Sequence, residues 1–430
     1  MQLVVKNIGK VRKAKLKIDG ITVIAGENAS GKSTLGKILY AFYRTLYDKA
    51  SKIKSQRISF IQNKLNFMYQ CIELNFNRVS LLDFIAKEIY DEFFLQENKE
   101  PLEADNNEAL KLYNLIKRQD PSFSISLDND IFKTFSSDIK KLKKLSDLDL
   151  LKSLLDLNLS CEFNNQINNV YTDELCNVSL QTKSRKICAT IAKHKILALE
   201  NDIVSLQEPI FIDNTIVLDE HLSNYLAEDP LKRLDHLGVL REQLERENLN
   251  EYDGNLIERQ IFEEDLSEVF KCLSTTCSGQ LVLDKGQLFY QHPSSDKLLV
   301  ASNLSEGVKY FAIIKKLLSN GVFKPNGLVI LDEAVNNIHP QLQITLAKIL
   351  VMLQQKLNLK LLIITNSPYL LQAIEVETAT ASIADKCKYY LAKNSKDNSI
   401  LEDVSCNIEL IYATLAKPFQ VLEDLKSTLC

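Results

Sequence analysis

The run GENASGKST at residues 26–34 constrains the fold of this chain more than any other part of its sequence. Gly26 and Gly31 allow the backbone to curl around an anion and to direct successive N–H groups at it. Lys32 is long enough to reach the outer phosphates of a nucleotide, and the Ser33 hydroxyl is placed to bind Mg²⁺. This combination is typical of a phosphate-binding loop, which joins a strand to a helix.

The residues on either side of the loop have the character that such a loop requires. Residues 20–25 (GITVIA) are a short, largely β-branched run that predicts a strand, and residues 35–40 (LGKILY) predict a helix. The positive N-terminal end of that helix then faces the bound anion. We therefore expect this chain to bind a nucleotide. The expected binding residues are Gly26, Asn28, Ala29, Ser30, Gly31, Lys32, Ser33 and Thr34.

Length and composition indicate a globular protein with two structural units. The 430 residues carry a formal net charge of −4, which argues against a globally basic nucleic-acid-binding protein. The nine cysteines are scattered without zinc-ribbon spacing and are expected to be reduced thiols. The N-terminus does not resemble a signal peptide, and no apolar run reaches membrane-spanning length. We expect a cytoplasmic protein without membrane contact.

Strand-like and helical periodicities occupy different parts of the chain. Strands are predicted near the N-terminus, a long helical region with little glycine follows, and alternating helices and strands return after residue 302. The expected fold class is α/β, with a mixed sheet assembled from both ends of the chain and interrupted by a helical insertion. The predicted boundaries are 1–40, 159–221 and 275–430 for the sheet domain, 41–158 for the insertion and 222–274 for a second helical segment.

Two further motifs follow the loop at a distance. Residues 327–331 (GLVIL) predict a buried strand, and the carboxylates Asp332 and Glu333 follow it directly. In a phosphate-loop ATPase the first carboxylate holds Mg²⁺ and the second polarises the attacking water. Ahead of that strand, Ser305 and Gly307 begin an apolar helix, where a hydroxyl and backbone N–H groups are offered to an anion. An ordinary helix N-cap is the alternative for Ser305 taken alone.

The order of these three motifs resembles the ABC-type ATPase heads, and within them the RecF/SMC-like and OLD-like branch. Asp332 and Glu333 are followed at a short distance by His339 and Pro340, as is usual in that branch. Residues 363–370 (IITNSPYL), a strand leading into a Ser-Pro turn, are also similar to it. The resemblance covers about the first 40 residues and the last 130, and it is weaker over the helical middle.

The resemblance implies ATP and Mg²⁺ as ligands and a role for each matching position. Lys32, Ser33 and Thr34 would hold the phosphates and the metal. Asp332 would hold Mg²⁺, and Glu333 would be the general base that makes the chain an ATPase.

The resemblance also implies a second copy of the chain. Such heads bind two ATP molecules between head-to-tail protomers, so Ser305 and Gly307 would contact the γ-phosphate of the other protomer in a homodimer. A glutamine that senses Mg²⁺ and water is expected as well. Gln166, in the run FNNQI at 163–167, is our candidate, with an ordinary polar loop residue as the alternative.

The sequence departs from the family pattern in two ways. Asn366 stands where a switch histidine is usual, and an amide can hydrogen-bond a phosphate but cannot carry a positive charge. Ala334 and Val335 replace the residues that usually follow Asp-Glu, including an acid. Both departures favour a slow, switch-like ATPase. His339 is expected to be a structural residue at a helix start.

The C-terminal region lacks the clustered carboxylates of the nuclease domain that OLD-like proteins carry. Residues 418–425 (PFQVLEDL) look instead like the tail of ATPases in Septu-type phage-defence systems, including retron-associated ones. Those ATPases work with a separately encoded HNH nuclease. Our first hypothesis is therefore an ATPase that regulates such a nuclease in anti-phage defence.

Two other classes of function remain open from the sequence. A RecF-like DNA-repair ATPase would bind DNA as an ATP-dependent dimer, with the helices around 140–144 and 233–246 as its only basic support. The subunit of a membrane ABC transporter is the third class, which the long insertion disfavours.

Overall fold

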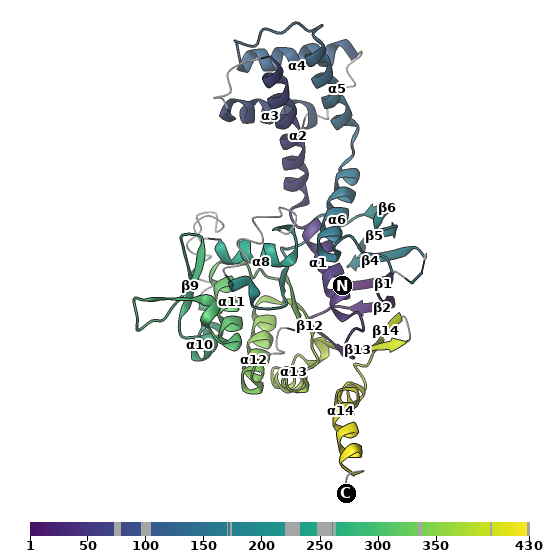
Figure 1. The fold of residues 1–430 in the computed structure, drawn as a ribbon, viewed down its shortest axis with the longest axis vertical. Coiled ribbons are helices and arrows are strands. Elements are labelled where there is room, and N and C mark those ends of the chain that lie inside the picture. The colour runs from purple at the N-terminus through teal and green to yellow at the C-terminus, as the bar shows by residue number, and fades with distance from the viewer. Residues whose placement is uncertain are drawn as a thin grey trace. The chain divides into compact units, whose positions relative to one another are not determined.

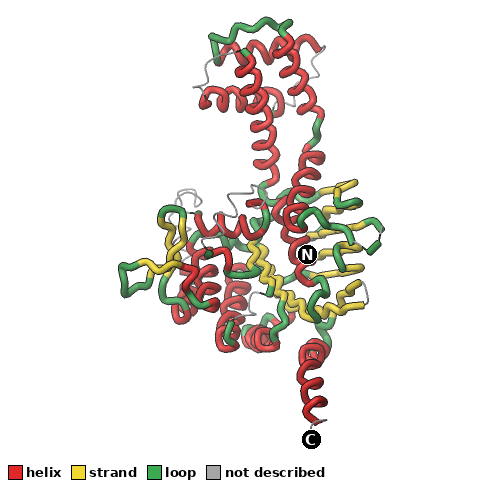
Figure 2. The backbone as a smooth tube through the Cα atoms, in the orientation of Figure 1, coloured by secondary structure: helices red, strands yellow, loops and turns green. Residues whose placement is uncertain are grey.

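The computed structural model describes residues 1–72, 79–95, 105–169, 171–172, 174–219, 233–246, 260, 264–333, 338–395 and 398–427. Within these residues the chain divides into two compact units, which Figures 1 and 2 show as a sheet-containing body and a group of helices. We call Met1–Tyr47 with Leu154–Cys430 the sheet unit, and Asp48–Ser153 the helical unit. No helix of the described residues is both long enough and apolar enough to cross a bilayer.

An eleven-stranded mixed sheet forms the centre of the sheet unit, in the order β6-β5-β4-β1-β2-β14-β13-β3-β12-β11-β7. Its strands are β1 (Gln2–Ile8), β2 (Val11–Lys17), β3 (Ile21–Gly26), β4 (Cys176–Thr182), β5 (Arg185–Ala192), β6 (Lys195–Asn201), β7 (Ile210–Ile212), β11 (Leu328–Asp332), β12 (Lys360–Ile364), β13 (Cys387–Ser395) and β14 (Asn398–Asp403). Strands from both ends of the chain therefore share one sheet, as predicted.

The sheet has a parallel half and an antiparallel half, and their sequences differ accordingly. Strands β13, β3, β12, β11 and β7 run parallel, and β3, β7 and β11 are buried along their whole length. Continuous apolar runs such as LVIL in β11 suit strands that are covered on both faces. Strands β1, β2, β4, β5 and β6 are antiparallel and alternate between buried and exposed residues, as expected where one face meets solvent.

Helices cover both faces of the parallel half. These helices and the remaining elements of the sheet unit are α1 (Lys32–Leu46), α8 (His236–Glu245), α10 (Ser267–Thr276), α11 (Glu306–Ser319), α12 (Pro340–Leu357), α13 (Pro368–Thr380), α14 (Glu409–Ser427) and a second sheet of β8 (Gln280–Asp284), β9 (Gln287–Gln291) and β10 (Leu298–Val300). Helix α1 lies against β11, β12 and β7, because Gly36 brings its backbone close to Ile330, Ile364 and Phe211. The apolar residues of α11, α12 and α13 join the core on the opposite face.

The helical unit has an apolar core of its own. It comprises α2 (Lys49–Cys71), α3 (Val79–Phe94), α4 (Asp105–Gln119), α5 (Asp130–Lys144) and the first turns of α6 (Asp147–Phe163). Phe123 lies at the centre of this core, with no exposed surface, and its ring lies 5.8 Å from that of Tyr69 and 5.6 Å from that of Tyr113.

The observed fold class confirms the predicted one, α/β with a mixed sheet interrupted by helices. The first predicted helix is longer than the motif indicated, since α1 continues to Leu46 before the helical unit begins. About half of the predicted second helical segment at 222–274 lies outside the described residues. Its described residues include α8 and most of α10. Eight cysteines of the described residues are free, as expected of reduced thiols.

Replacing Phe123 by alanine tests whether the two units fold independently. The change leaves a cavity among the aromatic rings, and we expect it to lower the stability of the helical unit by about 3–5 kcal/mol. Hydrogen exchange resolved by peptide measures this, and nucleotide binding by the sheet unit should be unchanged. The control is Phe84→Ala, because Phe84 is 47% exposed. Equal loss of protection in both units would contradict independent folding.

Candidate nucleotide and metal site

The phosphate-binding loop lies between β3 and α1, at the carboxyl end of the parallel strands. Gly26 has φ 141°, and a Cβ there would lie 2.2 Å from the carbonyl oxygen of Ala392. Gly31 has φ 76°, and its Cβ would lie 2.6 Å from a methyl group of Val11. Both positions need the conformational freedom and the small size of glycine. The sequence thus forms a tight loop that ends at the N-terminus of α1, a place where backbone N–H groups favour an anion.

Lys32, the first residue of α1, is held by the loop itself. Its ammonium group donates hydrogen bonds to the carbonyl oxygens of Gly26 (3.1 Å) and Glu27 (2.8 Å) and lies 4.0 Å from Oε1 of Glu333. The residue is only 4% exposed, and burial lowers its pKa although Glu333 and Asp332 oppose that effect. A phosphate group would replace neutral carbonyls with a charged acceptor, which is a stronger partner for this cation.

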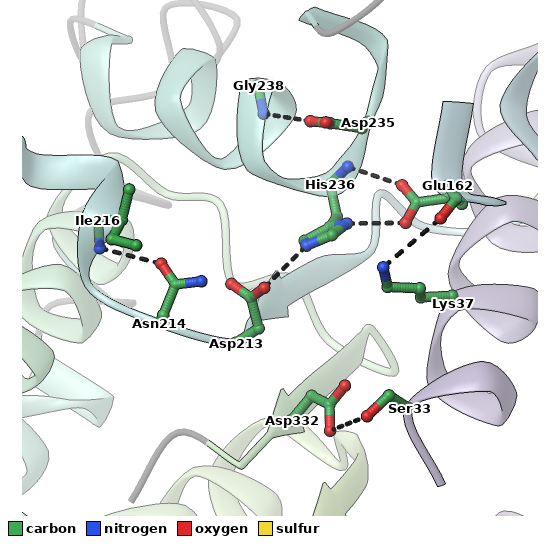
Figure 3. A network of polar contacts seen from close by, with 10 residues as sticks. All are labelled: Ser33, Lys37, Glu162, Asp213, Asn214, Ile216, Asp235, His236, Gly238 and Asp332. Atoms are coloured by element: carbon green, nitrogen blue, oxygen red, sulfur yellow. Dashed lines mark hydrogen bonds and ion pairs between the residues drawn. The ribbon is translucent and has the colours of Figure 1, made fainter. Parts of the chain in front are cut away.

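The next residue, Ser33, contacts the strand that carries the carboxylates. Its hydroxyl donates a hydrogen bond of 3.1 Å to Oδ1 of Asp332, at the end of β11 (Figure 3). Asp332 is 6% exposed, and burial raises its pKa to about 6, helped by the nearby charges of Glu333 and Asp213. The structure therefore brings together two of the three predicted metal residues, Ser33 and Asp332, at a place where burial disfavours the charged carboxylate.

Asp213 is a candidate site residue that the sequence analysis missed. Strands β7 and β11 are parallel neighbours with Ile212 opposite Leu331, so Asp213 and Asp332 each follow the last paired residue. Figure 3 shows both carboxylates at this edge of the sheet. The apolar run before Asp213 ends in a carboxylate just as β11 does, and this similarity was the signal available in the sequence.

A buried histidine fixes the orientation of Asp213 (Figure 3). His236, the first residue of α8, contacts Asp213 Oδ2 through Nε2 (3.1 Å) and Glu162 Oε2 through Nδ1 (2.7 Å), and its backbone N–H donates to Glu162 Oε1. Burial alone would lower the pKa of His236, but the two carboxylates outweigh burial and raise it to about 10. The ring is therefore an imidazolium at neutral pH, and both of its nitrogens donate. Lys37 of α1 also lies 3.5 Å from the carbonyl oxygen of Glu162.

The donor set at this edge suits Mg²⁺. A hydroxyl and two carboxylates are hard oxygen ligands, and Mg²⁺ is usually held by one or two carboxylates together with nucleotide phosphates and water. Oδ1 of Asp213 is buried without a hydrogen bond of ordinary geometry, which leaves it available as an acceptor. Ser33, Asp332 and Asp213 would hold the ion, which would supply positive charge beside the phosphates. Among the described residues, no group of three or more His, Cys, Asp or Glu side chains is arranged so that it could hold a metal ion by itself.

Glu333, which lies near the Lys32 ammonium group, is in contact with Asn366. Glu333 has a left-handed backbone (φ 51°), and its N–H donates to the carbonyl oxygen of Ile364. The Asn366 amide donates to Asn28 Oδ1 (2.9 Å) and to Glu333 Oε1 (3.4 Å), so it joins the loop to the predicted general base. The Glu333 side chain is 37% exposed, which leaves it accessible to water. A neutral amide thus occupies the position that the resemblance gives to a histidine.

The other predicted loop residues differ in their surroundings. Ala29 has a left-handed backbone (φ 57°), which helps to close the loop. The hydroxyl of Ser30 is buried without a hydrogen-bond partner, so a phosphate oxygen could accept from it. Thr34 lies next to Gly9 in the turn between β1 and β2. The predicted departures at Ala334 and Val335 lie outside the described residues.

Ser305 and Gly307 lie at the start of α11, away from these contacts. Ser305 is the N-cap residue but its exposed hydroxyl makes no capping hydrogen bond. A Cβ on Gly307 would lie 2.5 Å from a methyl group of Leu342, so this turn requires a small residue. Within the described part of the chain, no hydrogen bond or ion pair joins either residue to residues 26–34 of the same chain. The structure thus brings together Asn28, Lys32, Ser33, Asp332, Glu333 and Asn366, and it leaves Ser305 and Gly307 apart.

Gln166 is the predicted metal-sensing residue whose role stays a prediction. It follows α6 on an exposed loop, and its backbone N–H donates to the carbonyl oxygen of Phe163. No contact between its side chain and Ser33 or Asp332 is found among the described residues. His339, the remaining predicted structural residue, caps α12 by accepting from the backbone N–H of Gln341.

Asp332→Asn should stabilise the protein in the absence of Mg²⁺ and nucleotide. The raised pKa means that an ionised Asp332 opposes folding above about pH 6, and the difference from its ordinary value of 3.8 corresponds to at most about 3 kcal/mol. The gain should shrink as pH falls through about 6 and vanish below about 4, where both states bind the proton. Denaturant unfolding across this pH range measures it. A gain that is independent of pH would contradict the buried-charge explanation.

Asp213→Asn should weaken ATP binding in Mg²⁺ while leaving binding in excess EDTA nearly unchanged, because only the metal edge is altered. Titration calorimetry under both conditions measures the difference, and we expect a loss of about tenfold or more, the size seen when a metal's carboxylate partners are removed. The control is Asp219→Asn, whose carboxylate lies 3.8 Å from Lys309 rather than at the sheet edge. Equal losses with and without Mg²⁺ would show that Asp213 acts only on folding.

Comparisons with known proteins agree with a nucleotide-binding fold and leave the function open. Residues 189–372 match the family described as "AAA domain, putative AbiEii toxin, Type IV TA system", which is less than half of the chain and does not include residues 26–34. No curated protein matches the sequence significantly.

Similar solved structures include three heads of SMC proteins. One is the SmcHead bound to the C-winged helix domain of ScpA (12% identity, 94% of this chain and 97% of that chain, TM-score 0.43). Another is the SMC head domain from Thermotoga maritima (10%, 94% and 98%, TM-score 0.39). A third is the Smc head domain with an extended coiled coil bound to the C-terminal domain of ScpA from Pyrococcus furiosus (12%, 99% and 98%, TM-score 0.42). At these values the likeness carries no argument about function or partners.

Proposed function

We propose that this chain is a slow ATPase that binds Mg²⁺ and ATP, closes as a head-to-tail homodimer, and regulates a separately encoded nuclease in anti-phage defence. The observation that carries the ATPase part is the convergence of Lys32, Ser33, Asp332 and Glu333 at one edge of the parallel sheet. Lys32 and Ser33 begin α1, and Asp332 and Glu333 lie at the end of β11, in a distant part of the sequence. Their arrangement supports phosphate binding, metal binding and water activation at one place.

The chain's own residues divide the work of hydrolysis. Loop N–H groups and Lys32 bind the phosphates and offset their negative charge. Ser33, Asp332 and Asp213 would hold Mg²⁺, which neutralises charge on the phosphates when bound. Glu333 accepts the proton of the attacking water, and Asn366 orients Glu333 through its amide hydrogen bond. Because Asn366 carries no charge, it contributes less than an imidazolium would to stabilising the transferred phosphate, which favours slow turnover.

The separate location of Ser305 and Gly307 supports a dimer. At the start of α11 the Ser305 hydroxyl makes no capping hydrogen bond, and it lies at a helix N-terminus, where backbone N–H groups favour anions. The Ser305 hydroxyl is exposed, Gly307 beside it is buried, and within the described residues neither is joined to the loop of its own chain by a hydrogen bond. A second copy placed head to tail would bring them to the γ-phosphate.

Two observations support a protein partner of the nuclease kind. The C-terminal helix α14 exposes Phe419, Leu422 and Leu425, and such an apolar stretch is typical of a protein-binding surface. The matched family is described as an AAA domain and a putative AbiEii toxin of a type IV TA system. An HNH nuclease is the effector that the Septu-like tail favours.

The basic helices that favoured a DNA-repair ATPase are largely neutralised by neighbouring groups. Arg241 is buried and donates to the carbonyl oxygens of Val217 and Gly286, and Arg246 forms two hydrogen bonds with the Glu208 carboxylate. In α5, Lys141 and Lys143 pair with Asp138 and Glu108. These contacts reduce the support that the sequence offered for that alternative at these residues.

Glu333→Gln tests the catalytic assignment. The carboxamide cannot accept a proton, so we expect ATP affinity to be kept and hydrolysis to fall by about a hundredfold or more. Lys32→Ala should instead lose ATP affinity. Radiolabelled ATP binding and phosphate release measure both, with Glu88→Gln as the matched control because Glu88 belongs to the helical unit, pairs with Arg118 there, and is about as exposed as Glu333. Hydrolysis by Glu333→Gln at the wild-type rate would refute the general-base assignment.

Native mass spectrometry of the same variants tests the assembly. With Mg-ATP, Glu333→Gln should accumulate as a dimer, and adding Ser305→Arg should return it to monomer while each monomer still binds ATP. Purification of the tagged chain from its host, with and without Mg-ATP, tests the partner. A complex without any nuclease would overturn the regulatory proposal while leaving the ATPase proposal intact.

A further inference from the structure

One face of the antiparallel half of the sheet carries an unusual concentration of lysines. Strand β2 has the sequence VRKAKLK, in which Ala14 and Leu16 are buried and its three lysines, which alternate with them, are exposed. On the neighbouring strand β1, one further lysine is exposed. We call the exposed side chains of Lys6, Lys13, Lys15 and Lys17 the basic face.

Strand register places these lysines on one surface. Lys13 pairs with Lys6, Lys15 with Val4 and Lys17 with Gln2, and residues that are paired across strands point to the same side. Alternate residues of β2 also share a side, at about 7 Å spacing, so its lysines extend over about 14 Å. The same rows continue onto β4 and β5 as Asn177, Ser179, Gln181 and Thr190. The face is thus a band of lysines beside a band of uncharged hydrogen-bonding side chains.

This arrangement works against the stability of the free protein. Lys6 and Lys13 are directly opposite each other in an antiparallel pair, where like charges destabilise the sheet. Within the described part of the chain, none of the lysines of the basic face forms an ion pair with a carboxylate. The acids that lie toward the sides of this face are engaged elsewhere, since Glu200 lies 3.9 Å from Lys186 and Glu402 pairs with Lys393. A local rule is broken without internal compensation, which is typical of a functional surface.

The rest of the molecule makes the basic face stand out. The whole chain has a formal net charge of −4, and the lysines and arginines of α5 and α8 discussed above are paired with acids or buried. Several exposed lysines of the helical unit also have acidic partners, such as Lys64 with Asp138 and Lys111 with Glu92. The basic face is a local concentration of uncompensated positive charge on an acidic protein.

The chemistry of the face selects among polyanions. Lysines combined with Asn, Ser, Gln and Thr side chains match the groups that contact phosphates and sugars of a nucleic acid backbone. Single strands are usually held by aromatic stacking, and the rows named above contain no aromatic side chain. An anionic membrane surface would favour apolar groups that insert among the lipids, and in the described strands only the small aliphatic side chains of Val4 and Ile400 are paired with these lysines, without an aromatic anchor. A double-stranded backbone fits best.

We infer that the basic face, formed by Lys6, Lys13, Lys15 and Lys17 on β1 and β2, is a docking surface for the phosphodiester backbone of a nucleic acid duplex. Contacts of this kind position a duplex without reading its sequence. The inference goes beyond the proposed ATPase function and does not depend on it. It places nucleic acid on the antiparallel half of the sheet rather than on the helices that the sequence indicated.

Fluorescence anisotropy with labelled duplex DNA tests the inference, with duplex RNA as a second arm that identifies the natural source of the backbone. Binding is measured in EDTA without nucleotide, so that a failure of the ATPase proposal cannot affect it. Contacts from the basic face should make affinity fall about a hundredfold between about 50 and about 200 mM salt. Changing all of its lysines to glutamine should abolish most of this binding, and changing them to arginine should preserve it.

The matched control removes the same charge elsewhere, by changing Lys54, Lys111, Lys133 and Lys141 of the helical unit to glutamine. These lysines are similarly accessible and have acidic partners, so duplex binding should change little. ATP binding of every variant confirms folding. The inference is overturned by absence of duplex binding at low salt, by equal loss in the control, or by anionic vesicles competing better than duplex for the wild-type basic face.

Discussion

Buried negative charge at the carboxyl ends of β7 and β11 is the constraint on which the site depends. Asp213 and Asp332 end neighbouring parallel strands, where burial removes the solvation that a carboxylate needs. The protein compensates the first with a buried imidazolium. The second has a hydrogen bond from the Ser33 hydroxyl and the charge of Lys37, which do not outweigh burial, so Asp332 keeps a raised pKa. A divalent cation would relieve the remaining cost. The residues that weaken the empty protein are thus the ones that favour the loaded one.

The parts of the site that could be predicted from sequence are those encoded in short contiguous patterns. A pattern of fewer than ten residues predicts the loop at residues 26–34, and another predicts the strand before Asp332, because glycine spacing and apolar runs act locally. The sequence pattern around Asp213 is weaker, because β7 is only Ile210–Ile212 and a single carboxylate follows it. Its role depends on its neighbour in the sheet and on His236 and Glu162, which come from distant helices. No local pattern records such contacts.

The sequence predicts the fold better than it predicts which surfaces are positively charged. A sequence shows how many lysines and arginines a helix carries, but their electrostatic effect depends on partners supplied by other elements. Arg246 is held by Glu208, and Lys143 by Glu108, so the basic helices present less charge than expected. In β2 the lysines alternate with apolar residues, a pattern that is usual for a solvated strand. Only the register with β1 shows that Lys6 adds to the same surface. Gln166 stays a prediction, since its loop position neither includes nor excludes a part in metal binding.

The uncapped turn at Ser305 has a consequence for how a cell could control this protein. When the groups that complete a γ-phosphate site belong to a second copy, each molecule carries two half-sites and no whole one. The number of complete sites then rises with the square of the protein concentration while most molecules are single. Doubling synthesis would quadruple the closed form at low abundance, without any change in ATP. Expression level would itself be an input to the switch, alongside whatever signal acts on the nucleotide.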